Sequence, residues 1–221
     1  MNYIKINDIP ILIQKSVRAK RIALKQQISG TLVLVVPKYC PVWMATAFAK
    51  SQKAWIMAHA AHPPKRTTFS PGMVIEIVGQ PLTLAQGKPS HIQDGTLYLS
   101  GDLEFFHRRT CDYAKKMLLP FIQQEVTKLT QILGVSAKHI TLRNTSSRWG
   151  SCSNTHNLSF CWKIAFAPLY VIQYLVAHEV AHLVHMNHSP AFWAVVDDLT
   201  PHRKVAEKWL KTNSRDLQGI I

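Results

Sequence analysis

Four of the chain's eleven histidines fall within the eleven residues HEVAHLVHMNH, positions 178 to 188. In an α-helix, residues four apart share one face about 6 Å from each other, so His178 and His182 can point their rings at one metal ion. Glu179 follows the first histidine directly, where a carboxylate can take the proton of an attacking water. Two imidazole ligands and a general base in the pattern HExxH predict a metal-dependent hydrolytic site.

A third ligand would sharpen this prediction, and two histidines compete for that role. His185 comes seven residues after His178, so a continuous helix would carry it about 10 Å further along the axis. Three ligands on one straight helix would approach an ion from nearly one side, which is far from tetrahedral. His188 is the better candidate if the chain reverses direction before reaching it.

The residues around His188 are those that a reversal requires. Asn187 tolerates the left-handed backbone that ends many helices, and Ser189 followed by Pro190 is typical of an N-cap and a first helical residue. We therefore predict that one helix ends near Met186 and that another begins just after Ser189. The predicted zinc ligands are His178, His182 and His188, with a fourth position left open.

The neighbours of the cluster favour a buried site. The interleaved residues are apolar, namely Val176, Ala177, Val180, Ala181, Leu183 and Val184. Burial among them would make unliganded imidazoles and the lone carboxylate of Glu179 costly. The alternative, polar histidines on an exposed helix, leaves this apolar pattern without a cause.

The first hundred residues are rich in strand signals. Short β-branched stretches are broken by Gly, Pro, Asn and Asp, and an Asp-Gly pair at 94–95 predicts a hairpin turn. Residues 41–61 are the exception, because their apolar positions recur at helical spacing. We expect an amino-terminal, β-rich, basic lobe over 1–100 that carries one helix.

The remainder of the chain must position the histidine cluster. A helical pattern covers residues 102–134, with Pro120 at a kink or break. Strands are expected at HITLRN and LSFCWKIAFAP, on either side of the polar turn TSSRWGSCSNTHN, and a long helix should start near Pro168. We therefore expect an α+β fold whose catalytic lobe spans 101–221.

Composition limits the setting in which these lobes work. The 221 residues are 47% hydrophobic and 17% charged, which is typical of a globular protein. No apolar run reaches the roughly 18 residues of a membrane span, and the amino terminus lacks a secretory signal, so we expect a cytoplasmic protein without a membrane partner. The four cysteines form no CxxC pair, and we expect them to be reduced.

Basic residues are concentrated near the amino terminus. The chain has 26 Lys and Arg against 12 Asp and Glu, and residues 1–66 hold eleven of those basic side chains with a single acid, Asp8. Such a field attracts polyanions, so nucleic acid or a nucleotide is a candidate partner. A basic solvated surface is the alternative, because no aromatic-interleaved ribonucleoprotein motif and no zinc finger is present.

The stretch SRWGSCSNTHNLSFCWKIAFAPLYVIQYLVAHEVAHLVHMNHSPAFW, residues 147–193, resembles the signature of the YgjP-like metallopeptidases, which are related to SprT-like and WLM zinc proteases. The resemblance implies a zincin-like core, in which an HExxH helix lies beside a small β-sheet and a third histidine follows. Two residues depart from the expected patterns. His185 stands where metzincins of the same spacing have glycine, and Cys161 stands where an asparagine is expected.

The resemblance also suggests where substrate binds. In zincins, a strand beside the active-site helix often receives the substrate as an added strand, and by analogy Arg148, Trp149 and Ser151 line the cleft. Arg148 could bind a carboxylate, a phosphate or a developing oxyanion. Alternatively, Trp149 packs in the core and Arg148 ties down its loop, for example to Asp197 or Asp198.

Three functions are compatible with these residues. The first is a zinc-dependent peptidase acting on a protein or peptide, with Glu179 as general base. The second, suggested by an activity associated with a family member, is a metal-dependent UTP pyrophosphatase, although such reactions usually use oxygen-ligated magnesium or manganese. The third is a nucleic-acid-binding module with a structural metal, which three protein ligands beside an intact Glu179 speak against.

Overall fold

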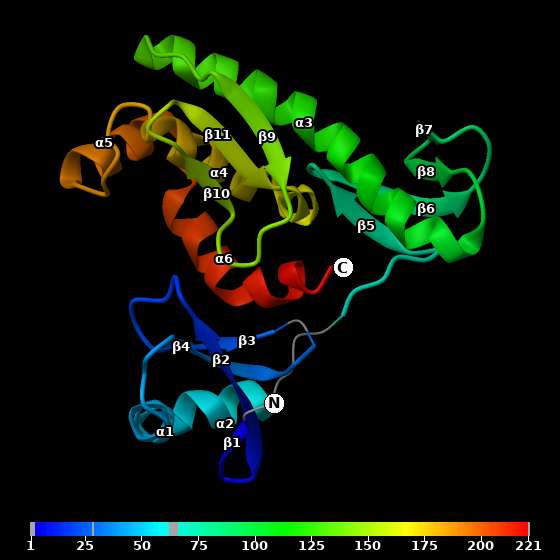
Figure 1. Cartoon of the computed structure of the whole chain (residues 1–221). Coiled ribbons are helices and arrows are strands. Elements are labelled where there is room, and N and C mark those ends of the chain that lie inside the picture. The colour runs from blue at the N-terminus through cyan, green and yellow to red at the C-terminus, as the bar shows by residue number, and fades with distance from the viewer. Residues whose placement is uncertain (1–2, 28, 62–65, 221) are drawn as a thin grey trace. The chain divides into compact units, whose positions relative to one another are not determined.

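The computed structural model describes residues 3–27, 29–61 and 66–220 (Figure 1). The chain divides into two compact units, one formed by residues 1–66 with residue 221 and the other by Thr67–Ile220. Each unit has a hydrophobic core of its own. Among the described residues, no helix combines the length and the apolar character that crossing a bilayer would require.

The amino-terminal unit is a four-stranded sheet with two short helices. Its strands β1 (Tyr3–Ile6), β2 (Ile9–Ser16), β3 (Ala23–Gln26) and β4 (Leu32–Pro37) are arranged in the order β1-β2-β4-β3, and β2 and β4 are parallel. The helical pattern of 41–61 forms two helices, α1 (Val42–Ser51) and α2 (Lys53–Ala61), interrupted at Gln52. Ala45, Ala49 and Ile56 turn from these helices into the core.

The second unit begins with another four-stranded sheet. Strands β5 (Val74–Ile77), β6 (Gln80–Gln86), β7 (His91–Gln93) and β8 (Thr96–Leu99) are arranged in the order β5-β6-β8-β7. The predicted hairpin turn joins β7 and β8, with positive φ angles at both Asp94 (46°) and Gly95 (72°). Positive φ angles at both central residues define a type I′ turn, whose twist matches that of the paired strands.

Helix α3 (Phe106–Leu133), preceded by the short 3-10 helix η1 (Leu103–Phe105), runs along the second unit (Figure 1). One face, from Phe106 to Leu129, is buried against β8, β9, α4 and η2. The helix passes through Pro120 without the predicted break. Pro120 lies on the exposed face, where water can hydrate the carbonyl that loses its helical hydrogen bond.

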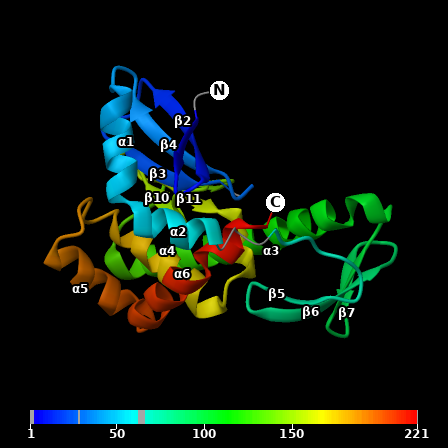
Figure 2. The same cartoon turned by 90° about the horizontal axis from the view of Figure 1, so that it is seen from below.

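A three-stranded sheet and three helices complete the second unit. Strands β9 (His139–Arg143), β10 (Gly150–Cys152) and β11 (Asn157–Cys161) are arranged in the order β10-β11-β9, so β10 is an edge strand. The predicted strand LSFCWKIAFAP continues past β11 only as a 3-10 helix, η2 (Trp162–Phe166). Helices α4 (Leu169–Ala181), α5 (Pro190–Leu199) and α6 (Arg203–Gln218) follow, and α4 contacts both others (Figure 2).

The units divide at a different point from the predicted lobes. The boundary lies between residues 66 and 67 rather than at 100, because the apolar face of β5–β8 joins the core of the second unit. Leu84, Leu97 and Leu99 are almost fully buried in the same cluster as Phe106 and Leu118 of α3. The predicted mixed α+β class is confirmed, and the four cysteines are free, as expected.

Candidate metal centre

The chain reverses direction between α4 and α5, but it does so earlier than predicted. Helix α4 ends at Ala181 rather than near Met186, and a turn follows in which the Val184 and His185 amides both donate to the Ala181 carbonyl, at 3.1 and 3.0 Å. Asn187 does not adopt a positive φ. Tightened hydrogen bonds of the last turn therefore satisfy the helix end in place of a left-handed residue.

The start of α5 follows the sequence prediction. The Ser189 side chain accepts a hydrogen bond from the Phe192 amide at 3.4 Å, and Pro190 is the first helical residue. This cap fixes where α5 begins, immediately after His188.

Three histidines meet across the reversal. One ring nitrogen from each of His178, His182 and His188 lies within 4.8 Å of the others, and the Nε2 atoms of His178 and His188 are 3.2 Å apart. His182 Nδ1 lies 3.0 Å from the carbonyl oxygen of His185. A proton on that Nδ1, donated to the carbonyl, leaves Nε2 of the same ring with its lone pair free.

Aromatic rings from α5 lie against the three histidines, of which His188 is exposed and the other two are partly buried. Phe192 is fully buried, and its ring centroid lies 4.5 to 5.0 Å from those of all three imidazoles. Trp193 stacks on His188 at 5.6 Å. The positions of both residues in the sequence also fit core packing. Their position in the first turn after His188 was the sequence signal for their role as walls of the site.

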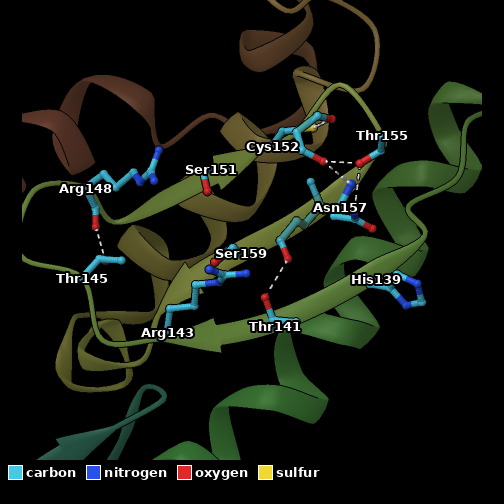
Figure 3. A pocket seen from close by; sticks show the side chains of 12 residues that line it. His139, Thr141, Arg143, Thr145, Arg148, Ser151, Cys152, Thr155, Asn157 and Ser159 are labelled. Atoms are coloured by element: carbon cyan, nitrogen blue, oxygen red, sulfur yellow. Dashed lines mark hydrogen bonds between the residues drawn. The ribbon is translucent and has the colours of Figure 1, made fainter. Parts of the chain in front are cut away.

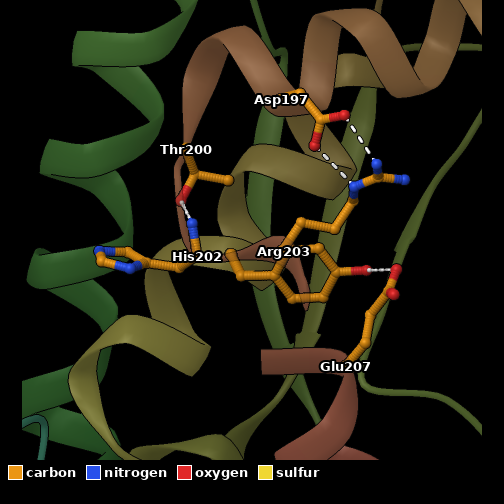
Figure 4. A network of polar contacts seen from close by, with 6 residues as sticks. Asp197, Thr200, His202, Arg203 and Glu207 are labelled. Atoms are coloured by element: carbon orange, nitrogen blue, oxygen red, sulfur yellow. Dashed lines mark hydrogen bonds and ion pairs between the residues drawn. The ribbon is translucent and has the colours of Figure 1, made fainter. Parts of the chain in front are cut away.

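Trp193 is itself held from α6. The Arg203 guanidinium lies 5.0 Å from the centre of its ring, and the same group forms two short contacts with the carboxylate of Asp197, at 2.6 and 2.7 Å (Figure 4). Asp197 therefore pairs with Arg203, not with Arg148. Tyr174 is also engaged, because its hydroxyl donates to the Glu207 carboxylate at 3.1 Å.

Glu179 is buried on the side of α4 that faces β10. Its side chain is 5% exposed, and its Oε2 atom has no hydrogen-bond partner among the described residues. A Cβ atom added to Gly150 would lie 2.6 Å from Glu179 Cγ, so only glycine lets the strand approach so closely. Burial raises the pKa of the Glu179 carboxyl to about 8, while the positive charge of Arg148 acts in the opposite direction.

These groups suit a cation. Burial, together with the neighbouring His182 and His188, lowers the pKa of His178 to about 4, so its ring is neutral and has a lone pair at physiological pH. Three imidazole ligands match zinc or another late transition metal better than magnesium or calcium, which prefer oxygen ligands. A cation beside Glu179 would also favour the ionised carboxylate.

The predicted substrate-binding residues lie in two different environments. Arg148 and Ser151 line a groove on the outer face of the β10-β11-β9 sheet. Trp149 instead turns inward, packs against the core and donates from Nε1 to Ser214 Oγ at 3.2 Å. The carbonyl of Arg148 accepts a hydrogen bond from Thr145 Oγ1 at 2.7 Å, which fixes the loop through its backbone.

A fold that brings three histidines together beside a buried glutamate is that of a metal-dependent hydrolase. The chain belongs to the YgjP-like family, whose metallopeptidase domain model matches residues 20–213. Membership confirms the resemblance of residues 147–193 and makes the chain a metal-dependent peptidase by class.

Other comparisons add less. The crystal structure of the metallopeptidase zymogen of Pyrococcus abyssi abylysin is similar at 18% sequence identity over 43% of this chain and 97% of that chain, with a TM-score of 0.38. A comparison with curated proteins finds no match.

Proposed function

We propose that this protein is a zinc-dependent peptidase in which His178, His182 and His188 hold the metal. The observation that carries the proposal is the convergence of three ring nitrogens within 4.8 Å of one another. Catalytic zinc sites commonly use three protein ligands and leave one position open. When bound, a zinc ion would supply Lewis acidity toward a substrate carbonyl and lower the pKa of water.

Glu179 is the residue that we propose moves the proton. Its Oε2 atom, which lacks a partner within the described chain, can accept a proton from the attacking water and pass it to the leaving amine. The contact with Gly150 holds the carboxylate in one position, and the charge of Arg148 favours its ionised form.

The free edge of β10 supports a peptide as the substrate. The residues that flank β10 bond to β11 through their backbones. The Trp149 carbonyl accepts from the Cys161 amide at 2.8 Å, and the Ser153 amide donates to the Asn157 carbonyl at 3.0 Å. By the alternation of an antiparallel ladder, the backbone groups of Gly150 and Cys152 point away from β11. A substrate strand could pair with them directly above Glu179.

Metal analysis of two matched variants tests the ligand set. We expect His188→Ala to lose the zinc that the wild-type protein retains through dialysis, because only two protein ligands remain. His185→Ala is the control, because it removes the side chain of a neighbouring histidine that contacts His182 through its backbone carbonyl. Equal zinc loss from both variants, or none from His188→Ala, would contradict the proposed set.

Glu179→Gln tests the proton transfer. Glutamine has the same shape but cannot accept the proton, so kcat for hydrolysis of a casein substrate should fall by at least about 100-fold while the zinc content stays at one equivalent. A variant that retains both zinc and full activity would exclude Glu179 as the base.

We also propose that the amino-terminal unit binds single-stranded nucleic acid. Two large aromatic side chains on it are unusually exposed, Tyr39 at 85% and Trp43 at 70%. Lys20 and Arg21 line the same surface hollow as Tyr39, and Lys38 lies over the Tyr39 ring. Exposed rings beside cations provide stacking surfaces for bases and charge for the phosphates.

Fluorescence anisotropy with a labelled oligonucleotide tests this second proposal. Affinity should fall steeply with salt, and Trp43→Ala should weaken binding by about 5-fold or more, because base stacking contributes about 1–3 kcal/mol. Leu103→Ala, at a residue of the other unit that is 59% exposed, is the control. An oligonucleotide affinity that changes neither with salt concentration nor in the Trp43→Ala variant would contradict the proposal.

A further inference from the structure

A polar groove of about 590 Å³ covers the outer face of the β10-β11-β9 sheet (Figure 3). Strand register aligns three hydroxyl side chains in one row across its floor, since Ser151 of β10 pairs with Ser159 of β11, which pairs with Thr141 of β9. All three residues line the groove. The floor therefore carries a row of hydrogen-bonding groups.

Two arginines line the same groove. Arg143 lies on β9, two residues beyond Thr141 and on the same face, and Arg148 lies in the loop that leads into β10. Figure 3 shows the Arg143 guanidinium turned back over the sheet beside Ser159, with Arg148 on the side of Ser151. Strand β9 and the loop before β10 thus each place a cation next to the row of hydroxyls.

Neither arginine forms a salt bridge within the described residues, although the charge of Arg148 also acts on Glu179. The salt bridges of the described residues join Lys115 with Asp112 and Arg203 with Asp197, and none of the residues lining the groove is acidic. The planar guanidinium fork matches the geometry of carboxylate and phosphate groups. Together with the hydroxyls, the arginines form a surface complementary to an anion.

The groove is continuous with the edge where we propose that substrate binds. Ser151 points to the groove, whereas Gly150 faces Glu179 on the opposite side of the sheet. Side chains of a strand added beside β10 would alternate in the same way, so every second one would lie over the groove.

We propose that this groove binds the anionic side chain of a peptide substrate, with Arg143 and Arg148 as the recognising residues. The inference rests on the proposed peptidase function and adds a substrate class to it. The enzyme then prefers peptides whose alternate residues carry carboxylates, or phosphates of the same geometry, over neutral peptides of equal size.

A matched pair of peptides tests the proposal without requiring turnover. One fluorescent peptide carries Glu at alternate positions and the other carries Gln, and binding of each is measured to the zinc-loaded Glu179→Gln protein. We expect the Glu peptide to bind at least about ten-fold more tightly, because charge-assisted hydrogen bonds are much stronger than neutral ones. Arg143→Met should remove most of this preference for the Glu peptide, and Arg143→Lys should retain only part of it.

The control is Lys116→Met, which removes one positive charge from an exposed position on α3 outside the groove. Equal binding of the two peptides, or an equal loss of preference in the Lys116 and Arg143 variants, would overturn the proposal. UTP at equimolar concentration should displace neither peptide. If UTP binds in an Arg143-dependent way and the protein shows no preference for the Glu peptide, the groove is a nucleotide site instead. Failure to hydrolyse any peptide would refute the peptidase function but leave the Arg143-dependent preference intact.

Discussion

Glycine at position 150 is required by a packing constraint between two elements. Strand β10 passes so close to α4 that an added Cβ atom would lie 2.6 Å from Glu179 Cγ and 2.7 Å from its Cδ. The carboxylate is buried in the remaining space, and the apolar surroundings raise its pKa. A residue without a functional group thus determines where the proposed general base lies.

Gly150→Ala is expected to displace Glu179 and to reduce kcat by about 100-fold, which is the order of loss that a shift of 1 Å can cause. The same overpacking should lower the free energy of unfolding by about 1–3 kcal/mol. Gly87→Ala is a matched control, since its Cβ would lie 2.8 Å from Tyr98 Cδ1, far along the chain from the site. Urea unfolding and casein hydrolysis should show that only Gly150→Ala loses activity.

At the scale of elements, local signals in the sequence predicted more than distant ones. The spacing of His178 and His182 and the Ser189 cap are properties of neighbouring residues, and the structure brings the predicted histidines together. The end of α4 was placed too late, because its last turn is closed by backbone hydrogen bonds that no Gly or Asn announces. Periodicity alone does not give the role of Phe192, because it identifies a buried ring but not its partners; only its position in the first turn after His188 points to the site.

The helix η2 shows why a strand pattern can mislead. WKIAF is mostly apolar and aromatic, as strands often are, yet residues 162–166 form a 3-10 helix. Its residues Trp162, Lys163, Ile164 and Ala165 are all buried. The Lys163 ammonium reaches the end of α6 and donates to the Gln218 carbonyl at 2.7 Å. Tertiary contacts of this kind override local propensity, and the sequence gives no sign of them.

Lys163→Met tests the link between η2 and α6 through its pH dependence. Burial lowers the pKa of Lys163 below its ordinary 10.5, although nearby Cys161 and Cys111 act in the opposite direction. At a pH between the lowered pKa of folded Lys163 and 10.5, the unfolded chain holds the proton and the folded chain has lost it. The contribution of Lys163 to the free energy of unfolding therefore rises with pH in this window and is constant below it. The destabilisation by Lys163→Met, measured by urea unfolding, should therefore grow as the pH rises towards 10.5, by up to about 1.4 kcal/mol per pH unit. Exposed Lys116→Met should show no such trend, and a pH-independent cost at Lys163 would contradict the argument.

At the scale of the whole molecule, the proposed metal centre and the proposed nucleic-acid surface belong to units with separate hydrophobic cores. Every residue of the larger hydrophobic cluster belongs to Thr67–Ile220, and every residue of the smaller one lies before residue 62. The charge is divided as well, because residues 1–66 hold eleven basic residues and one acid, with Lys65 outside the described residues. The sequence showed the charge gradient directly, but it did not show that β5–β8 packs with α3, since core membership depends on contacts far apart in the chain.

A chain that begins at Thr67 is therefore expected to fold and to hold zinc without the amino-terminal unit. All the residues of the candidate metal centre lie beyond its start, and a domain of about 150 residues buries roughly 70% of the surface that its unfolded chain exposes. Its thermal unfolding, followed by circular dichroism, should be one cooperative transition, and zinc analysis should give one equivalent as for the full chain. Oligonucleotide affinity should be lost, because Tyr39, Trp43 and most of the amino-terminal cations are absent. A truncated chain that unfolds without cooperativity would show that the second core depends on the first, and one that keeps full nucleic-acid affinity would place that binding elsewhere.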